Sequence, residues 1–268
     1  MSGAVDWAGA AHPRAVAPRI ASLVPSLTEL LFALGLGGCV VARTGFCVHP
    51  RGAVRRVPKV GGTKDVDLDA LRAARPTHLV VNVDENRRET VDAARAFVPS
   101  VIVTHPLAPE DNRRLYALFG AIFGRDDQAA RLTRTFDDSL AALERAVAPL
   151  PRERVLYLIW REPWMTVARD TYVSATLARA GFDTLPSEAA SRYPTLDANE
   201  AAWRDADRLL LSTEPYAFRE RDRVALAQAT GKRVDLIDGE WTSWYGSRAI
   251  EGLEALARFR SASGRVPA

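Results

Sequence analysis

Short apolar runs rich in β-branched residues alternate along the chain with longer stretches whose apolar residues recur every three or four positions. The first pattern is typical of buried strands and the second of amphipathic helices. Their alternation predicts an α/β fold in which helices connect parallel strands. The expected strands cover residues 19–24, 39–43, 78–82 and 100–103 in the first half, and 154–160, 208–212 and 233–237 in the second.

A long helix is predicted between the two halves. Residues 126–148 contain neither Gly nor Pro, and Pro149 and Pro151 follow them, so the helix is expected to end there. Its apolar residues recur at roughly helical spacing: Ala130, Leu132, Phe136, Leu140, Leu143 and Ala146. The predicted organisation is an N-terminal extension over 1–18, a first lobe over 19–108, a linking region with this backbone helix over 109–150, and a second lobe over 151–268.

The two halves also resemble each other. Residues 66–81 (VDLDALRAARPTHLVV) and 195–211 (TLDANEAAWRDADRLLL) share a turn, a helix and a strand, which indicates duplication. Two Rossmann-like lobes with parallel sheets are therefore expected. Such lobes bind ligands at the carboxyl ends of their strands, so we expect the loops there to line a ligand cleft between the lobes.

Composition narrows the range of partners. The 268 residues are 47% hydrophobic and 26% charged, with a net charge of +3 and the charges scattered, which favours neither nucleic acid nor a membrane as partner. No apolar stretch reaches the roughly 18 residues of a membrane span. The first 25 residues lack an apolar signal-peptide core. A cytoplasmic monomer is expected if Met1 is native, and a periplasmic one if a signal peptide has been removed.

Aromatic and charged residues gather in the loops expected after the second-lobe strands. Five of the six Trp residues lie in the second half, and such rings beside charges suit a flat ligand with polar edges. The alternative is that the aromatics cap the core while the charges pair on the surface, which fits Trp203 best. For the group as a whole we favour ligand contact. The predicted ligand-binding residues are Trp160, Glu162, Trp164, Glu214, Tyr216, Glu240, Trp241, Trp244, Tyr245 and Arg248.

In the first lobe, a Cys-x-His pair stands among the residues expected to bind the ligand. Thiolate and imidazole are suitable metal ligands, so Cys47 and His49 are metal candidates. Two ligands do not complete a metal site. The favoured alternative is that Cys47 is a structural residue and that Pro50 fixes His49 in a turn. A nucleophilic Cys47 with His49 as base would lack a third group to orient the base. The predicted ligand-binding residues of this lobe are Phe46, Cys47, His49, Thr63, Lys64, Glu85 and Asn86.

Sequence motifs of common enzymes are absent. Residues 61–64 (GGTK) lack the spacing of a phosphate-binding loop, and Asp65 or Asp67 is more simply the N-cap of the next helix. The sequence contains no H-E-x-x-H, G-x-S-x-G or G-x-G-x-x-G. No catalytic residues are assigned, and no cofactor is required.

The segments RIASLVPSLTELLFALGLGGCVVARTGFCVHP and VPKVGGTKDVDLDALRAARPTHLVV resemble the helical-backbone metal receptors, the binding proteins of cobalamin and ferric-siderophore uptake. The match extends from about Arg19 to Arg258. It implies two α/β lobes bridged by a rigid helix, a cobalamin-like corrinoid or other metal chelate as ligand, and the membrane subunit of an ABC transporter as partner. FCVHP, GGTK, ENR, WREPWM, RYP, EPYAF and DGEWTSWYGSR are similar to a subgroup that commonly lacks signal peptides.

The resemblance also implies roles for individual residues. Phe46 matches one ligand-stacking aromatic, and residues 160–164 lie where another is found. Thr63 and Lys64 replace a further aromatic, and an ammonium group suits a ligand with carboxylates. Asp69 matches an acidic residue that docks to the importer; the second such position falls on Asn199, beside Glu200. The alternative function is a cytoplasmic metal- or tetrapyrrole-handling protein or enzyme that uses Cys47 and His49 without an importer.

Overall fold

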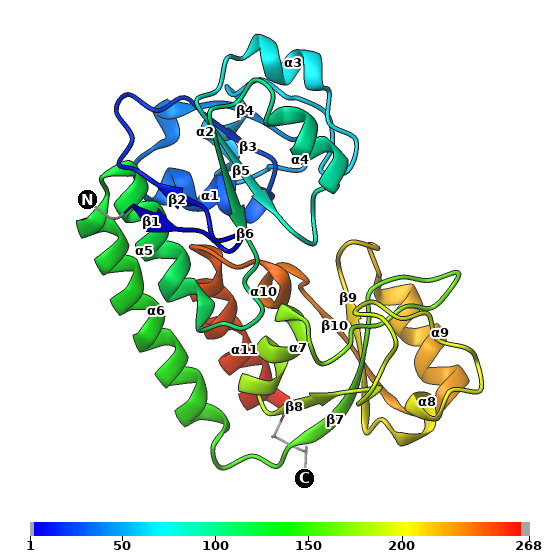
Figure 1. Cartoon of the computed structure of the whole chain (residues 1–268). Helices are drawn as coiled ribbons and strands as arrows, with labels where there is room; N and C mark the ends of the chain where they lie inside the picture. Colours follow the sequence, from blue (N-terminus) through cyan, green and yellow to red (C-terminus); the bar gives the residue numbers. More distant parts are fainter. Residues whose placement is uncertain (1–2, 264–268) are drawn as a thin grey trace. The chain divides into compact units, whose positions relative to one another are not determined.

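The structure, a computed structural model, describes residues 3–263 and divides them into two compact units (Figure 1). Unit 1 contains residues 3–106, 110–135 and 245–248. Unit 2 contains residues 107–109, 136–244 and the described residues from 249 onward. The boundary near the middle of the chain falls between Thr135 and Phe136, inside the linking region.

Unit 1 is built on a four-stranded parallel sheet in the order β4-β3-β5-β6. Its apolar core includes Leu23, Leu71, Leu79 and Val101, which explains the apolar runs of the strands. The four predicted strands are confirmed within a few residues. The sheet consists of β3 (Ile20–Ser22), β4 (Val40–Arg43), β5 (His78–Asn82) and β6 (Ser100–Thr104), with α1 (Pro25–Ala33), η1 (Gly37–Cys39), α2 (Arg51–Val54), α3 (Leu68–Ala73) and α4 (Arg88–Ala94) between them.

The predicted N-terminal extension carries an antiparallel pair, β1 (Ala4–Val5) and β2 (Ala11–His12), which is fastened to unit 1. Asp6 Oδ2 accepts hydrogen bonds from Val103 N at 2.9 Å and from His12 Nε2 at 3.0 Å. Burial raises the pKa of Asp6, but the hydrogen bonds from Val103, His12 and Ala10 outweigh it and hold that pKa below its usual value. The carboxylate therefore ties this hairpin to β6.

Unit 2 contains a second parallel sheet, in the order β10-β9-β7-β8. Three of its strands were predicted; β8 was not, because it spans only three residues and contains Asp183. The core includes Leu156, Leu209 and Phe218. The elements are β7 (Glu153–Leu158), α7 (Tyr172–Arg179), β8 (Phe182–Thr184), α8 (Ala201–Asp205), β9 (Arg208–Ser212), α9 (Glu220–Thr230), β10 (Arg233–Ile237), α10 (Glu240–Ser243) and α11 (Arg248–Ser263).

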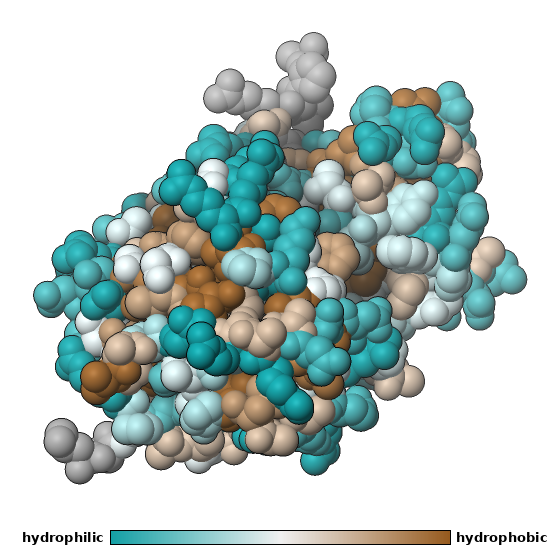
Figure 2. Space-filling view, turned by 90° about the horizontal axis from the view of Figure 1, so that it is seen from above, coloured by the Kyte–Doolittle hydropathy of each residue, from teal (hydrophilic) through white to brown (hydrophobic). Residues whose placement is uncertain are grey.

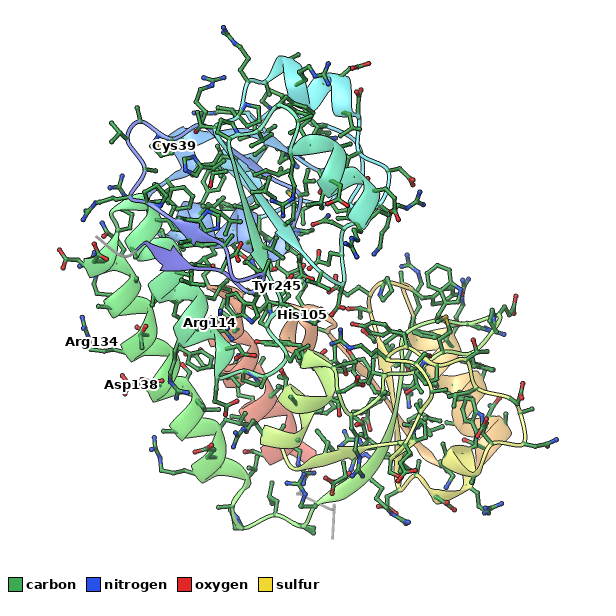
Figure 3. All side chains as sticks on the ribbon, viewed as in Figure 1. Cys39, His105, Arg114, Arg134, Asp138 and Tyr245 are labelled. Carbon is green, nitrogen blue, oxygen red and sulfur yellow. The ribbon has the colours of Figure 1, made fainter. Side chains whose placement is uncertain are left out.

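Two consecutive helices fill the predicted linking region. Helix α5 (Asp111–Phe123) ends at Gly124, which adopts the left-handed conformation that favours glycine (φ 64°). Helix α6 (Asp126–Val147) has 22 residues and is therefore about 33 Å long, which confirms the predicted backbone helix. Arg134 and Asp138 are exposed one turn apart on it (Figure 3). Across the described residues, no helix combines the length and the apolar character needed to cross a membrane.

Candidate ligand-binding loops

The loops that could bind a ligand follow the carboxyl ends of the strands in each unit. Because all strands of a sheet are parallel, these ends lie at one edge of that sheet. In unit 1 they lead into residues 44–50, 83–87 and 105. In unit 2 they lead into residues 159–165, 213–218 and 238–244.

In the loop after β4, two apolar side chains are exposed and the thiol between them is buried. Phe46 is 63% exposed and Val48 is 47% exposed, whereas Cys47 has no exposed surface. Thr28 Oγ1 donates a hydrogen bond to the Cys47 sulfur at 3.1 Å, and Thr44 Oγ1 lies 3.2 Å from it. Burial raises the pKa of the Cys47 thiol, which disfavours the thiolate that a metal or an electrophile would need.

The structure buries Cys47, and its predicted contact with a ligand or a metal stays a prediction. The side chain belongs to the core, because the threonines of α1 and the loop enclose its sulfur. His49 is half-buried in the same loop. No group of three or more His, Cys, Asp or Glu residues that could hold a metal ion occurs among residues 3–263.

Arg43, which the sequence patterns did not single out, organises this loop from inside. Its guanidinium is buried and donates hydrogen bonds to the carbonyl oxygens of Val54 (2.9 Å), Thr44 (3.0 Å) and Cys47 (3.1 Å). No carboxylate of the described residues pairs with it. Arg43 is a charged residue at the end of an apolar strand, and this was the sequence signal that could have revealed its role. A buried cation needs polar partners, so an arginine at this position is expected to bind nearby polar groups.

Asn86 links three loops at the edge of the unit 1 sheet. Its amide nitrogen donates hydrogen bonds to the carbonyl oxygens of Leu23 (3.2 Å) and Thr63 (3.0 Å), while its Oδ1 accepts one from Asn82 N (2.9 Å). The residue is buried. Asn86 therefore has a structural role through its amide, and its predicted contact with a ligand stays a prediction. Asn82 has a similar role that the sequence did not reveal.

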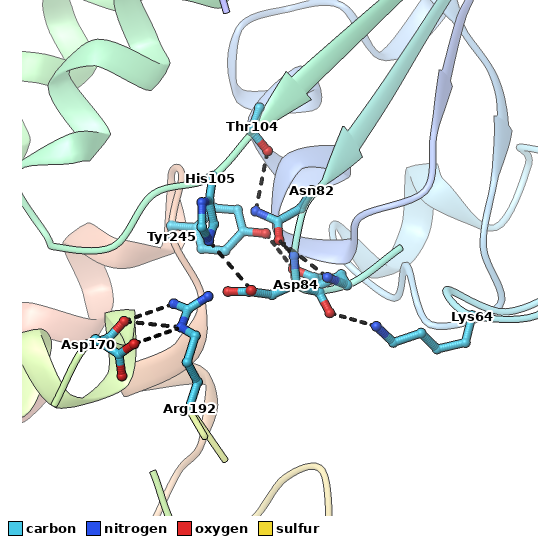
Figure 4. Close-up of polar contacts among 9 residues, drawn as sticks. Lys64, Asn82, Asp84, Thr104, His105, Asp170, Arg192 and Tyr245 are labelled. Atoms are coloured by element: carbon cyan, nitrogen blue, oxygen red, sulfur yellow. Dashed lines mark hydrogen bonds and ion pairs between the residues drawn. The ribbon is translucent and has the colours of Figure 1, made fainter. Parts of the chain in front are cut away.

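Lys64 and the turn after β5 are joined directly. Lys64 Nζ donates a hydrogen bond to the backbone oxygen of Asp84 at 2.6 Å (Figure 4). The Asp84 carboxylate lies 3.5 Å from His105 Nε2. Lys64 remains exposed, so its ammonium group is accessible to a ligand as well as to the turn.

Tyr245 belongs to unit 1 and contacts Glu85. Its hydroxyl donates a hydrogen bond to Glu85 Oε1. Burial and then the nearby Glu85 charge raise the pKa of Tyr245 well above its usual value. The ring is buried and belongs to unit 1 rather than to the predicted second lobe, while its predicted contact with a ligand stays a prediction.

Arg248 is held in an ion pair. Its Nε and Nη2 atoms donate to the two oxygens of Glu29 at 2.8 and 2.6 Å, and both side chains are mostly buried. Two of the five N–H donors of the guanidinium thus bind one carboxylate. The predicted contact of Arg248 with a ligand stays a prediction.

In unit 2, an aromatic pair stands at the end of β7. Trp160 is 40% exposed, and its ring lies edge-on to Tyr216 with centroids 5.5 Å apart. Trp164 instead stacks on Phe218 at 6.0 Å and packs against Trp203 at 5.5 Å. Trp164, Trp203 and Tyr216 are all partly buried against the core of unit 2, whereas Trp160 is exposed.

The loops after β9 and β10 meet through Glu214. Glu214 Oε1 accepts hydrogen bonds from Ser243 Oγ at 2.7 Å and Trp244 Nε1 at 2.8 Å. Burial raises the pKa of Glu214, and the nearby charges of Glu240 and Asp238 add to this. Trp244 is buried with its indole nitrogen bonded to Glu214, and its predicted ligand contact stays a prediction.

The remaining predicted residues of unit 2 lie around this loop cluster. Glu240 and Trp241 are half-buried at the start of α10, and Glu162 is exposed beside Arg161, with 3.4 Å between Arg161 Nε and Glu162 Oε1. Figure 2 shows hydrophilic residues over much of one face of the protein, with hydrophobic residues exposed between them.

The two predicted docking residues are both exposed at helix starts. Asp69 lies in the first turn of α3, whose N-cap Asp67 accepts a hydrogen bond from Ala70 N at 2.9 Å. Glu200 is the N-cap residue of α8, and its backbone nitrogen donates to Asp197 O at 3.1 Å. Each carboxylate thus lies at the start of a short helix of a different unit, and only α3 has a side-chain cap.

Sequence comparison decides the family. Residues 20–233 match the sequence pattern of the family described as "Periplasmic binding protein". The chain belongs to this family. Its resemblance to the cobalamin and siderophore type of binding protein is thereby confirmed.

Named relatives of this periplasmic binding protein include two curated sequences. The vitamin B12-binding protein of Vibrio parahaemolyticus is 21% identical over 226 residues, covering 84% of this chain and 75% of the relative. An uncharacterized ABC transporter substrate-binding lipoprotein of Bacillus subtilis is 24% identical over 259 residues, covering 89% and 78%.

Solved structures show that the fold is shared. The periplasmic heme-binding protein of Roseiflexus sp. RS-1 gives a TM-score of 0.79 at 21% identity, covering 92% of this chain and 99% of that chain. The periplasmic vitamin B12-binding protein of Vibrio cholerae gives 0.79 at 17% identity, covering 93% and 98%. These likenesses cover both four-stranded parallel sheets of this chain.

Proposed function

We propose that this chain is a substrate-binding protein for a corrinoid or another metal chelate such as heme. Its family supports the class of function, and relatives named for vitamin B12 and heme support the class of ligand. The observation that carries the proposal is the exposure of two aromatic side chains, Phe46 and Trp160, each in the loop that follows a strand.

Exposed rings at these positions suit a flat macrocycle. Phe46 follows β4 and Trp160 follows β7, so each stands at the sheet edge where α/β units bind ligands. Stacking on a ring contributes about 0.5–1.5 kcal/mol beyond the apolar area that it covers. The neighbouring Tyr216 fixes the orientation of Trp160 through its edge-on contact.

We also propose that the protein delivers its ligand to the membrane subunit of an ABC importer on the periplasmic side. A relative described as an ABC transporter substrate-binding lipoprotein supports this partner. Asp69 and Glu200 are the proposed docking residues, because exposed carboxylates at helix starts can meet arginines of a membrane subunit.

Difference absorption spectroscopy with heme and dicyanocobinamide tests the ligand class. We expect Phe46→Ala and Trp160→Ala each to weaken binding of the preferred chelate by about tenfold, which corresponds to about 1.4 kcal/mol. The matched control is Val16→Ala, which removes an exposed apolar side chain near the amino end of β3. If both aromatic variants bind as tightly as the control, the stacking role is wrong.

A further inference from the structure

A segment of unit 1 carries cations and no acids. Between Glu29 and Asp65 the sequence contains six Lys or Arg residues and no Asp or Glu. This local excess is larger than the net charge of +3 of the whole chain. The cations are Arg43, Arg51, Arg55, Arg56, Lys59 and Lys64.

Residues 51–59, which we call the basic segment, contain four of these cations. Arg51, Arg55, Arg56 and Lys59 are all exposed, and none pairs with a carboxylate of the described residues. Elsewhere in the chain, exposed arginines such as Arg152 and Arg154 bind neighbouring aspartates at 2.6 and 2.7 Å. The basic segment therefore presents its charge to solvent without a protein counter-ion.

Arg43 connects the basic segment to the loop that exposes Phe46. Its Nε donates to Val54 O of α2, while its Nη1 donates to Thr44 O and Cys47 O of the loop. After α2 the chain returns to the end of β4, where Arg43 N donates to Pro58 O and Val60 N donates to Arg43 O. Figure 1 labels α2 and β4 in the same part of unit 1.

We propose that the basic segment selects a chelate that carries carboxylate groups. This inference rests on the proposed function and narrows its ligand class. Exposed like charges add their fields over about 8 Å at physiological salt. Because the basic segment begins directly after the loop 44–50 that carries Phe46, its charge favours a ligand at Phe46 with anionic edges over an uncharged one. The exposed ammonium group of Lys64 adds to the same field.

The deciding experiment compares porphyrins that differ only in edge charge. Heme has two carboxylates, and its dimethyl ester has none. We expect wild-type protein to bind heme at least tenfold more tightly, and we expect this preference to shrink when salt is raised from about 0.05 to 0.5 M, because the Debye length falls.

A double variant tests whether the basic segment causes the preference for heme over its dimethyl ester. Arg55→Gln combined with Arg56→Gln is expected to weaken heme binding by about tenfold and leave binding of the ester within about twofold. The matched control is Arg131→Gln combined with Arg134→Gln, which removes the same charge from two exposed residues of α6 in unit 1. This control is expected to bind both porphyrins like wild type.

The alternative outcomes separate the two proposals. Equal affinity for heme and its ester, a preference for dicyanocobinamide over heme, or equal losses in both double variants would overturn the charge selection and leave the proposed function intact. Failure of wild-type protein to bind heme, the ester and dicyanocobinamide would contradict both proposals together.

Discussion

The hydroxyl of Tyr245 donates a hydrogen bond to the carboxylate of Glu85, a residue 160 positions earlier in the chain. Both groups lie in unit 1. The contact closes the segment 245–248 onto the turn after β5. Without the hydroxyl, the half-buried carboxylate would lose a protein donor.

Tyr245→Phe is therefore expected to lower the free energy of unfolding by about 1–2 kcal/mol, since it removes a hydrogen bond to a charged group. Tyr216→Phe is the matched control, because the Tyr216 hydroxyl makes no hydrogen bond to any described residue, and it should unfold like wild type. Urea unfolding of both variants provides the comparison. Equal stability of the two would show that the Tyr245 hydroxyl contributes nothing.

The backbone geometry of residues 245–248 can be tested at Gly246. Its φ is +82°, and an added Cβ would lie 3.3 Å from Leu30 Cβ. Its nitrogen donates to Asn112 Oδ1 at 2.6 Å, and its oxygen accepts from Tyr116 at 2.8 Å, so the segment cannot shift without losing these bonds.

Gly246→Ala should lower the free energy of unfolding by at least about 1–2 kcal/mol, from the left-handed conformation alone. Gly38→Ala is the control, because an added Cβ at this exposed position meets no atom within 4 Å. Thermal unfolding monitored by circular dichroism compares the two. A Gly246→Ala protein that melts with the control would contradict the described geometry.

The buried phenol of Tyr157 leads us to expect a lower free energy of unfolding at alkaline pH. Burial raises its pKa to about 12, and its hydroxyl donates to Ser212 Oγ at 2.9 Å. The folded protein holds the phenolic proton of Tyr157 more tightly than the unfolded chain does, so this group stabilises the folded state fully at pH values below the unfolded pKa near 10. The stabilisation is lost as the pH rises from about 10 to about 12. The loss should approach about 2–3 kcal/mol, from two pKa units at 1.36 kcal/mol each.

Urea unfolding at several pH values measures this effect against Tyr157→Phe. The slope of stability against pH above about 10 should be shallower in the variant, since it lacks the buried phenol. An identical slope in both proteins would mean that Tyr157 titrates normally.

The raised pKa of Glu214 leads us to expect a pH dependence of the same sign as that of Tyr157, but at lower pH. Its pKa is raised, chiefly by burial, so the folded protein holds this proton more tightly than the unfolded chain. Stability from this group should therefore fall as pH rises through the raised pKa. Glu214→Gln keeps an oxygen to accept from Ser243 and Trp244 while removing the charge.

We expect Glu214→Gln to be more stable relative to wild type at pH 8 than at pH 4, in chemical unfolding. Glu162→Gln is the control, because the Glu162 side chain is exposed. A relative stability of Glu214→Gln that does not change with pH would show that the carboxyl is not desolvated.

Periodicity predicted most of the fold because buried parallel strands leave apolar runs that stand out from their polar surroundings. Residues 78–82, 208–212 and 233–237 are strands with the predicted bounds. Strand β8 was missed because three residues with a central Asp183 give no such run. The hairpin β1–β2 was missed because contacts with residues distant in sequence hold it, such as those of Asp6 with Val103 and of His12 with Ser100, and these leave no local pattern.

The site was less predictable because residue type does not reveal side-chain direction. Trp160 and Trp164 are four positions apart in one loop, yet Trp160 is exposed and Trp164 stacks on Phe218. Trp244 and Arg248 were expected to meet a ligand, but Glu214 and Glu29 are their partners. These partners lie 30 and 219 positions away, beyond the reach of motif spacing.

Isothermal titration calorimetry of the wild-type protein with heme and dicyanocobinamide tests the central claim most directly. The account predicts saturable binding of at least one chelate at one site, with a Kd of about 1 μM or tighter, equivalent to about −8 kcal/mol. The absence of saturable heat with both chelates at concentrations up to about 100 μM would contradict the assignment as a binding protein for metal chelates.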